Sequence, residues 1–352
     1  MTAGPTPEAP VPGLISAAPD SQAPISEAQW AHAVKILQSA DEICLACHVR
    51  PDADALGSMV ALARALTARP GQTARVVASF GDAPFEIPAI LKFLPGLSCL
   101  SDPAGYPARP QVMVTLDAGS VDRLGLLTAS ATAAAELIVL DHHASNTRFG
   151  SVNLVDPAAA ATAVLVADLI SRLEVPLTPD IALGLYAGLV TDTGSFKFAS
   201  TTPAVHELAA RLLATGIDPG IVSRHLYDTA PFAYLPMLAA ALGRAVLEPE
   251  VANGLGLVWT TVTRKDRGSL PFDAAEPVID VIRRTQEAEV AAVLKESDDG
   301  TWQVSTRSKS IVDVSAVCAA LGGGGHARAA GFSASGGPDE AVAALRRLLD
   351  KQ

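Results

Sequence analysis

Acidic and imidazole side chains follow three short apolar segments of this chain. They are His48, Asp52 and Asp54 after residues 43–47, Asp117 after residues 112–116, and Asp141, His142 and His143 after residues 137–140. In an open parallel sheet, ligands collect at the carboxyl ends of the strands. If the three segments are neighbouring strands, their carboxylates and imidazoles meet in one crevice. The spacing therefore predicts a metal site.

Each of these groups also has an ordinary structural interpretation. Asp52 and Asp54 follow a proline, where turn and helix-cap residues are common, and the triplet at 141–143 could begin a polar loop. Asp192, in Thr-Asp-Thr-Gly-Ser, could end a helix, and the four glycines at 322–325 could form a flexible linker. Their joint occurrence, in an order that fits one sheet, favours the chemical interpretation.

The elements that would position these residues alternate between strand and helix in the first part of the chain. Ser26 can cap a first helix. We expect strands at 43–47, 74–80, 112–116 and 137–140, and further helices at 56–66, 84–94, 124–135, 159–173, 179–190 and 203–214. Such alternation is typical of βαβ units and predicts a mainly parallel sheet flanked by helices.

The later part of the chain predicts a smaller α/β domain with a mixed sheet. Strands are expected at 256–262, 290–296 and 302–306, and helices at 275–284, 312–321 and 339–349. We therefore divide the chain into a disordered tail (1–25), a catalytic domain (26–214), a helical linker (215–234) and a second domain (235–352).

Composition limits the class of partner. Lys and Arg number 26 against 37 Asp and Glu, a net charge of −11, so an extended cationic surface for long duplex nucleic acid is excluded. A small anionic substrate held by metal ions and a few Arg is compatible with this charge. Only 5% of residues are aromatic, which argues against a long base-stacking platform.

The four cysteines do not indicate a disulfide scaffold in a chain of this length. Cys44 and Cys47 have C-x-x-C spacing, but residues three apart on a strand point to opposite faces. They are therefore predicted to pack in the core instead of sharing a metal. The first 22 residues lack the charged start and apolar core of a signal peptide, and no apolar run approaches the ~20 residues that span a bilayer. We expect a soluble, cytoplasmic protein without membrane contact.

These motifs together resemble the DHH/DHHA1 phosphoesterase family, which is named for the triplet that stands here at 141–143. The resemblance extends from about Ser26 to the C-terminus. It is carried by His48-Val-Arg-Pro-Asp-Ala-Asp54, Asp117-Ala-Gly-Ser-Val-Asp-Arg123-Leu-Gly, the triplet itself, Thr191-Asp192-Thr-Gly-Ser-Phe, Arg307-Ser308-Lys309, and Gly322-Gly-Gly-Gly-His326-Ala-Arg-Ala-Ala-Gly331-Phe. The family's inorganic pyrophosphatases carry a different C-terminal domain, and its long RecJ nucleases carry extra domains. Length and C-terminal motif resemble the nanoRNase and pAp-phosphatase (NrnA-type) branch.

The resemblance implies that two divalent metals bind in the crevice, with at least one carboxylate bridging them. Their ligands would be His48, Asp52, Asp54, Asp117, His142 and Asp192. Mixed imidazole and carboxylate ligands favour Mn²⁺, with Mg²⁺ and Co²⁺ as alternatives, and the absence of Cys ligands argues against a structural zinc.

The resemblance also implies catalytic and substrate-binding residues. Asp141, His142 and His143 are the catalytic candidates. His143 would serve the scissile phosphate or leaving oxygen as general acid or hydrogen-bond donor, or else would orient another ligand. The candidates for substrate binding are Arg307, which would pair with a phosphate, Ser308, His326, the backbone of Gly323, Gly324 and Gly325, and Arg123 near the metals. A surface salt bridge for Arg307 and a helix-end role for Arg123 are the ordinary alternatives.

By this resemblance the expected activity is metal-dependent hydrolysis of oligoribonucleotides of a few residues to 5′-mononucleotides, and of 3′-phosphoadenosine 5′-phosphate (pAp) to AMP. Short single-stranded RNA or DNA and nucleotides would be its partners, and a homodimer is left open. Three alternatives stay open. They are a phosphodiesterase for cyclic dinucleotides or for pApA and pGpG, a RecJ-like single-strand exonuclease, and an inactive nucleotide sensor.

Overall fold

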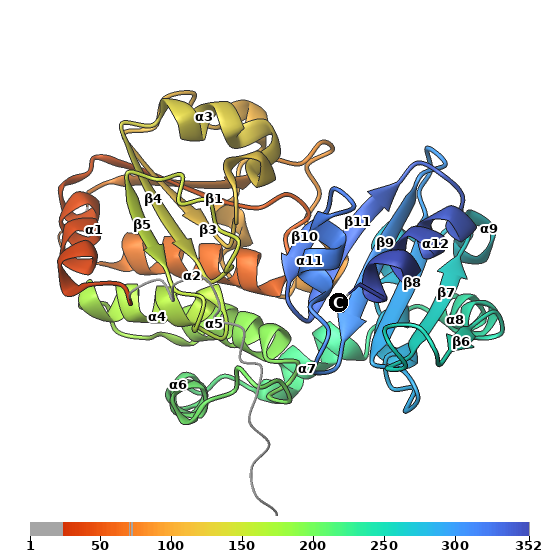
Figure 1. The fold of residues 1–352 in the computed structure, drawn as a ribbon. Helices are drawn as coiled ribbons and strands as arrows, with labels where there is room; N and C mark the ends of the chain where they lie inside the picture. The colour runs from red at the N-terminus through yellow and green to blue at the C-terminus, as the bar shows by residue number, and fades with distance from the viewer. Residues whose placement is uncertain (1–23, 70, 72, 352) are drawn as a thin grey trace, which may run out of the picture.

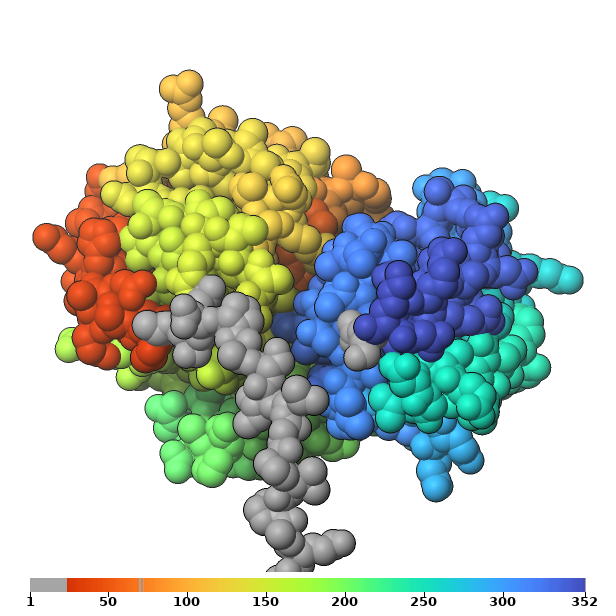
Figure 2. All heavy atoms as spheres, in the orientation of Figure 1, coloured from red at the N-terminus to blue at the C-terminus, as the bar shows by residue number. Residues whose placement is uncertain are grey.

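The computed structural model describes residues 24–69, 71 and 73–351. It contains two α/β halves that lie side by side, the first drawn in red to green and the second in teal to blue (Figure 1). In the space-filling view the surface is hollowed along the line where the two halves meet (Figure 2). The predicted tail at 1–25 lies outside the described residues, except for residues 24 and 25.

The first half is built on a five-stranded sheet in the order β2-β1-β3-β4-β5. Its strands are β1 (Glu42–Cys47), β2 (Arg75–Phe80), β3 (Val112–Leu116), β4 (Glu136–Asp141) and β5 (Val152–Val155). All neighbouring pairs are parallel. The order of the strands reverses between β1 and β3, and open α/β sheets bind ligands at such a point, outside the carboxyl ends of the strands. The adjacency of β1, β3 and β4 confirms the parallel sheet that the sequence predicts.

Helices cover both faces of this sheet. On one face lie α1 (Glu27–Ser39), α2 (Ala53–Ala68), α4 (Thr162–Arg172), α5 (Pro179–Asp192) and α6 (Pro203–Leu213), and on the other α3 (Thr128–Ala133) (Figure 1). Cys47 packs in the core on the α2 side and Cys44 in the core on the α3 side. This placement confirms that the C-x-x-C pair points to opposite faces.

Three glycines allow α5 to lie directly against α2. A Cβ at Gly57 would stand 2.4 Å from the carbonyl oxygen of Gly184, and a Cβ at Gly184 would stand 2.6 Å from that of Gly57. A Cβ at Gly188 would stand 2.5 Å from Oδ1 of Asp54. Close contact therefore brings the end of α5, which carries Asp192, toward the start of α2.

The second half contains a six-stranded sheet in the order β10-β11-β9-β8-β7-β6. Its strands are β6 (Val246–Glu248), β7 (Leu257–Val262), β8 (Val290–Glu296), β9 (Trp302–Ser308), β10 (Gly324–His326) and β11 (Ala329–Ala334). Only the β7–β8 pair is parallel, so the sheet is mixed, as the sequence predicts. Helix α7 (Pro219–Tyr227) precedes this half, whose own helices are α8 (Tyr234–Leu242), α9 (Arg264–Arg267), α10 (Val278–Ile282), α11 (Val314–Ala319) and α12 (Pro338–Leu349).

The two faces of this sheet are covered differently. One face packs on α11 and α12, while the β7–β8 part of the other face packs on α8 and α10. Beyond that part, the second face carries Ser305 and Arg307 on β9, Ala329 and Gly331 on β11, and His326 on β10. These small or polar side chains turn toward the first half.

Several local predictions were wrong. No helix spans 84–94, where only a 3₁₀ turn (Ala89–Leu91) forms, because Pro84 and Pro88 remove donors and restrict the residues before them. The segment 124–135 is a 3₁₀ stretch (Val121–Leu127) with left-handed Gly125, followed by the short α3. The glycine run is not a flexible linker, since part of it forms β10. Strands β5, β6, β10 and β11 were not expected.

Among the described residues, no helix combines the length and the apolar character that crossing a membrane requires.

Candidate metal centre

Three strand ends place the candidate residues around one point. His48 directly follows β1, Asp117 directly follows β3, and Asp141 is the last residue of β4. Nδ1 of His48 donates a hydrogen bond to the carbonyl oxygen of Val49 at 2.8 Å, which leaves Nε2 facing the crevice. Asp117 has a φ of 58°, a left-handed conformation that costs backbone energy and is often found at functional sites.

Two helix termini supply the remaining carboxylates. Oδ1 of Asp52 caps α2 by accepting from the backbone N–H groups of Asp54 and Ala55, each at 3.0 Å. Asp54 is fully buried and accepts from the N–H groups of Thr162 and Ala163 at 2.6 and 2.9 Å. These groups begin α4, so an unpaired helix N-terminus holds the Asp54 carboxylate. The helix-cap interpretation of Asp52 is therefore correct, yet its Oδ2 still lies 3.8 Å from Nε2 of His48.

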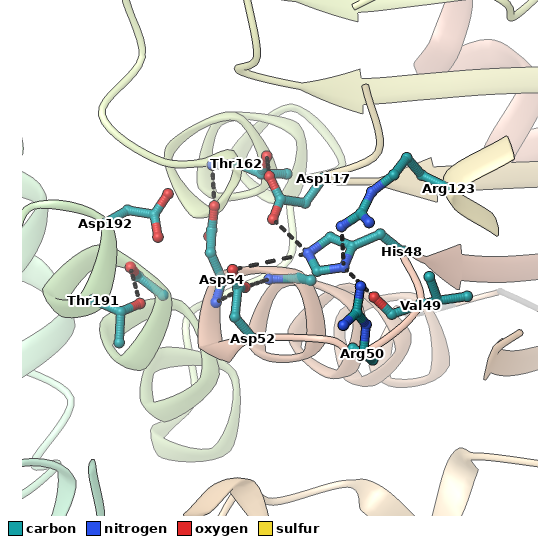
Figure 3. Close-up of polar contacts among 12 residues, drawn as sticks. His48, Val49, Arg50, Asp52, Asp54, Asp117, Arg123, Thr162, Thr191 and Asp192 are labelled. Atoms are coloured by element: carbon teal, nitrogen blue, oxygen red, sulfur yellow. Dashed lines mark hydrogen bonds and ion pairs between the residues drawn. The ribbon is translucent and has the colours of Figure 1, made fainter. Parts of the chain in front are cut away.

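Asp117 lies between two groups of candidate ligands. Its Oδ2 is 3.5 Å from Nε2 of His48, and its Oδ1 is 3.5 Å from Nε2 of His142. Nε2 of His142 lies 3.1 Å from Oδ2 of Asp192 and 3.9 Å from Oδ2 of Asp54. Figure 3 shows the carboxylates of Asp52 and Asp117 joined to the His48 ring and the Asp54 carboxylate directed to Thr162, with Asp192 at the end of α5.

Four sets of candidate ligands lie in the described residues, and three of them include Asp117. Two of these three, His48 with Asp52 and Asp117, and Asp54 with Asp117 and His142, consist of sequence-predicted ligands, and the ligand atoms of each set lie within 4.8 Å of one another. The arrangement brings all six sequence-predicted ligands together. Two cations with a shared carboxylate fit it, and we infer that Asp117 is that carboxylate.

The charges of this crevice are unbalanced without a cation. Burial, and then the nearby Asp192 and Asp117, raise the pKa of Asp54 well above its usual range. Burial and neighbouring carboxylates such as Asp52 also raise the pKa of Asp192 to about 6. Nε2 of His142 is buried and makes no well-aligned hydrogen bond in the described part of the chain, although Oδ2 of Asp192 lies 3.1 Å away. Because buried carboxylates and poorly paired ring nitrogens are costly, the residues present fit divalent metals.

The pKa values of the imidazoles reflect the same excess of negative charge. Burial alone would lower the pKa of His48, but its contact with Asp117 and the charge of Asp52 raise that pKa to about 9. The pKa of Asp117 is lowered in return, because His48, His142 and His143 outweigh its burial. The donor set of carboxylate and imidazole, without thiolate, suits Mn²⁺ and also Mg²⁺ or Co²⁺.

Asp141 belongs to a further candidate set, with Asp117 and His143, but both of its carboxylate oxygens also accept hydrogen bonds. Its Oδ1 accepts from Nδ1 of His143 at 2.7 Å, and its Oδ2 accepts from Nδ2 of Asn146 at 2.6 Å. Asp141 therefore fixes the tautomer and the direction of His143, whose Nε2 is left for another partner. We accordingly assign Asp141 a positioning role in place of the catalytic role expected from the motif.

The second half contributes His326 directly to this centre. The His326 ring stacks on His143 with centroids 4.2 Å apart and planes at 20°, and it lies 5.0 Å from the ring of His142. Burial, reinforced by the charges of His143 and His142, lowers the pKa of His326 to about 3. His326 therefore faces the centre as a neutral ring with hydrogen-bonding nitrogens.

The other predicted substrate residues differ in placement. Arg307 is half-buried, donates from Nη1 to the carbonyl oxygen of Thr306 at 3.0 Å, and forms no ion pair with any residue that the structure describes. Ser308 lies on the opposite face, where its hydroxyl donates to Glu289 at 2.9 Å, so the structure does not bring it to Arg307. Arg123 does reach the centre, with Nη2 3.4 Å from Nδ1 of His48.

The glycines at 323–325 are explained first by strand pairing. A Cβ at Gly323 would stand 2.0 Å from the carbonyl oxygen of Gly331, and Gly325 has a φ of 139°. A Cβ at Gly324 would meet no described atom within 4 Å. Gly323 and Gly325 thus allow β10 to lie against β11 and to carry His326 to the centre.

Sequence reasoning missed two residues that hold the centre. The Thr162 hydroxyl donates to Oδ1 of Asp117 at 2.9 Å, and Asn146 holds Asp141. Asn146 stands three residues after His143, a spacing within one loop that could have indicated it. Thr162 gives no local signal, because its role depends on where α4 begins.

Comparison with known proteins supports this geometry. The profile of the DHH family, N-terminal domain, matches residues 42–189, and that of the DHHA1 domain matches residues 262–352. The chain is 34% identical over 294 residues to the bifunctional oligoribonuclease and PAP phosphatase NrnA of Thermus thermophilus, covering 84% of each protein. It is 26% identical over 296 residues to a probable bifunctional oligoribonuclease and PAP phosphatase NrnA of Streptococcus mutans, covering 84% of this chain and 90% of the relative.

A solved structure shares the fold of both halves. The crystal structure of an exopolyphosphatase-related protein from Bacteroides fragilis superposes with a TM-score of 0.80 at 23% identity, covering 93% of this chain and 96% of the other. At this identity the likeness shows the fold alone.

The shared position of Asp117 predicts how metal binding responds to substitution. The unaltered chain should bind two Mn²⁺ per molecule, and saturation should add about 2–3 kcal/mol to the free energy of unfolding. Asp117→Asn should reduce the stoichiometry below one at the same Mn²⁺ concentration, because both ligand sets lose a charge. Titration calorimetry and thermal melts measure this, and Asp122→Asn is the control because Asp122 is an exposed carboxylate nearby. Two ions bound to the Asp117 variant would contradict the assignment.

The pairing of the glycine run with β11 predicts that Gly323 and Gly324 differ in how well they tolerate a side chain. Gly323→Ala should lower the free energy of unfolding by about 1–3 kcal/mol, because its methyl group meets the β11 backbone. Gly324→Ala should change it by less than about 0.5 kcal/mol, since its methyl group has open space. Urea unfolding of both variants tests this, and equal losses would show that β10 is not held as described.

Proposed function

The chain belongs to the DHH/DHHA1 family of metal-dependent phosphoesterases, and on this basis we propose that it hydrolyses oligoribonucleotides of a few residues to 5′-mononucleotides and pAp to AMP. One observation carries the proposal. Two ligand sets that share Asp117 lie against His326 of the second half, and the same sheet face of that half carries Arg307, which has no ion-pair partner among the described residues. One bound substrate could therefore contact both the metal centre and the anion-binding side chain of Arg307.

The chain's own residues would divide the work of hydrolysis. Divalent cations held here would activate water and neutralise phosphoryl oxygens. His143, held by Asp141 through Nδ1 and with its pKa raised, against the effect of burial, by Asp141 and Asp117, would act in its doubly protonated form and donate the Nε2 proton to the leaving oxygen. His326 would hydrogen-bond the phosphate or leaving group from the opposite side of the crevice.

The sheet geometry accounts for both substrates with a single arrangement. His326 pairs with Ala329, which pairs in turn with Arg307, so His326 and Arg307 lie in one row two strands apart. Their backbones are therefore roughly 10 Å apart. Both side chains extend from the sheet toward the substrate, so a single nucleotide could contact both residues. Arg307 would hold a 5′-phosphate while the phosphorus on the 3′ oxygen of the same nucleotide is attacked. A dinucleotide then yields two 5′-mononucleotides, and pAp yields AMP and phosphate.

The relatives support this choice of substrates over others. Two proteins matched over most of their length carry the names of an oligoribonuclease and PAP phosphatase. Hydrolysis of cyclic dinucleotides or of long single strands remains the competing activity within the same class, and we propose that this chain works on the shorter, linear substrates in the cytoplasm.

A substrate panel tests the proposed activity. With Mn²⁺, pApA and pAp should be hydrolysed, and cyclic di-AMP and a ~24-nucleotide strand, longer than the site of a single OB fold, should be hydrolysed at least about tenfold more slowly. The physical reason would be that the second half, whose His326 stacks on His143 at the centre, limits the length of strand that the site accepts. The reaction is started by adding Mn²⁺ and stopped by chelating it, and chromatography of the products gives the rates. Preferential hydrolysis of cyclic di-AMP or of the long strand would replace the proposal with the corresponding alternative.

The anchoring of a 5′-phosphate by Arg307 predicts a second result. Replacement of Arg307 by Gln should lower kcat/KM for pApA by about 10- to 100-fold, the worth of a charged hydrogen bond, while ApA, which lacks the phosphate, should lose little. Steady-state rates on the two substrates measure this. Exposed Arg284→Gln is the matched control. Equal rates of the unaltered chain on pApA and ApA would contradict the anchor.

A further inference from the structure

A buried lysine lies on the same sheet face as Arg307. Lys295 on β8 is 3% exposed and pairs in register with Gln303 of β9. Alternate residues of a strand share a face, so Gln303, Ser305 and Arg307 point to the same side as Lys295. Nζ of Lys295 donates to the Ser305 hydroxyl at 2.9 Å and forms an ion pair with Glu276. Lys295 is thus paired with a residue four positions along β9 from Arg307, and its Nζ contacts Ser305, which is two positions from Arg307.

Glu276, the partner of this lysine, is not itself buried to the same degree. Its side chain is 47% exposed. One carboxylate oxygen forms the ion pair with Lys295, and the other accepts a hydrogen bond from the Ser305 hydroxyl at 3.2 Å. A carboxylate offers about four acceptor positions, so acceptor capacity remains. Burial would raise the pKa of Glu276, but the charges of Lys295 and Arg307 lower it. Glu276 therefore presents an ionised acceptor, fixed in direction, beside Arg307.

This group faces the first half without belonging to the metal centre. Arg50, two residues before Asp52, is near enough for its charge to contribute to the lowered pKa of Lys295, after burial and alongside Arg307. The ring of Phe272 lies 5.5 Å from Nζ of Lys295 and covers it from another side. None of the candidate metal-binding sets in the described residues includes Glu276. The carboxylate is thus available to a molecule that enters between the halves.

The neighbouring charges define what such a molecule must offer. A guanidinium with no ion pair suits a phosphate, and an ionised carboxylate beside it suits a hydroxyl donor and repels a second phosphate. A nucleotide combines a phosphate with ribose hydroxyls at close range. Carboxylates that accept from a ribose 2′-hydroxyl are a known means of nucleotide recognition, and this hydroxyl is what distinguishes RNA from DNA at a site.

We propose that Glu276, held in place by Lys295 and Ser305, accepts a hydrogen bond from a ribose 2′-hydroxyl next to the phosphate bound by Arg307, and so gives the enzyme its preference for ribonucleotides. This inference rests on the proposed function, because it requires a nucleotide on Arg307. Glu276 is a specificity-determining residue in this account and takes no part in the bond-breaking step.

The test compares pApA with its all-deoxy counterpart pdApdA in the full-length chain with Mn²⁺. The unaltered chain should prefer pApA by about tenfold or more in kcat/KM, the worth of one hydrogen bond to a charged group. Glu276→Gln should lose most of that preference, through a fall in the rate on pApA. Glu287→Gln, at an exposed carboxylate in the same half, should keep the preference.

A second variant controls for a loss of stability caused by Glu276→Gln. Glu276→Gln leaves Lys295 buried without its counter-ion, which can destabilise the chain, so the double variant Glu276→Gln, Lys295→Met removes both charges together. It should show the same loss of preference. Calorimetric affinities for AMP and 2′-deoxy-AMP give a readout independent of hydrolysis, and their ratio should also fall toward one in both variants.

The outcomes separate the two proposals. An equal fall on pApA and pdApdA, or an undiminished preference in both variants, would overturn the inference and show that the Glu276–Lys295 pair is structural. Equal rates of the unaltered chain on the two substrates would overturn it as well. Absence of hydrolysis of either substrate by the unaltered chain would overturn the proposed function, and the affinity ratio would then decide the ribose contact by itself.

Discussion

Repulsion among carboxylates gathered in one crevice is the constraint on which this structure depends. Asp54, Asp117 and Asp192 come from three separate elements, and each would be easier to solvate if it stood alone. The fold holds them with groups that donate hydrogen bonds or carry positive charge. A backbone N–H group at the N-terminus of α4 donates to Asp54, the Thr162 hydroxyl donates to Asp117, and the His142 ring contacts Asp192. Cations would offset the charge that remains, which fits the inferred metal centre.

The two halves are complementary in charge, which explains why the chemistry needs both. The first half supplies the acidic strand and helix ends, and the second supplies Arg307 and the buried Lys295 on one sheet face. They meet where His326 stacks on His143. On the proposed function, a phosphate ester would be held from both sides, because its anionic oxygens suit cations bound by the first half and Arg307 of the second.

Much of the first half could be predicted from the sequence, because three apolar segments of strand length end in polar residues and a parallel sheet brings such ends together. Residues whose role depends on a distant element could not be predicted, as with Thr162, which lies at the start of α4. Ser308 is an instructive error. The expected strand stopped at residue 306, so the alternation that turns Ser308 away from Arg307 was not applied. The glycine run was equally hard to interpret, since glycine gives no periodicity and only pairing with β11 makes β10 a strand.

The central claim is that Asp117 is shared between two cations, and anomalous diffraction from crystals grown with Mn²⁺ tests it most directly. The account predicts two anomalous peaks, one beside His48 and Asp52 and the other beside Asp54, His142 and Asp192, with Asp117 contacting both. A single peak, or a peak among the rings of His142, His143 and His326 with none at Asp117, would contradict it.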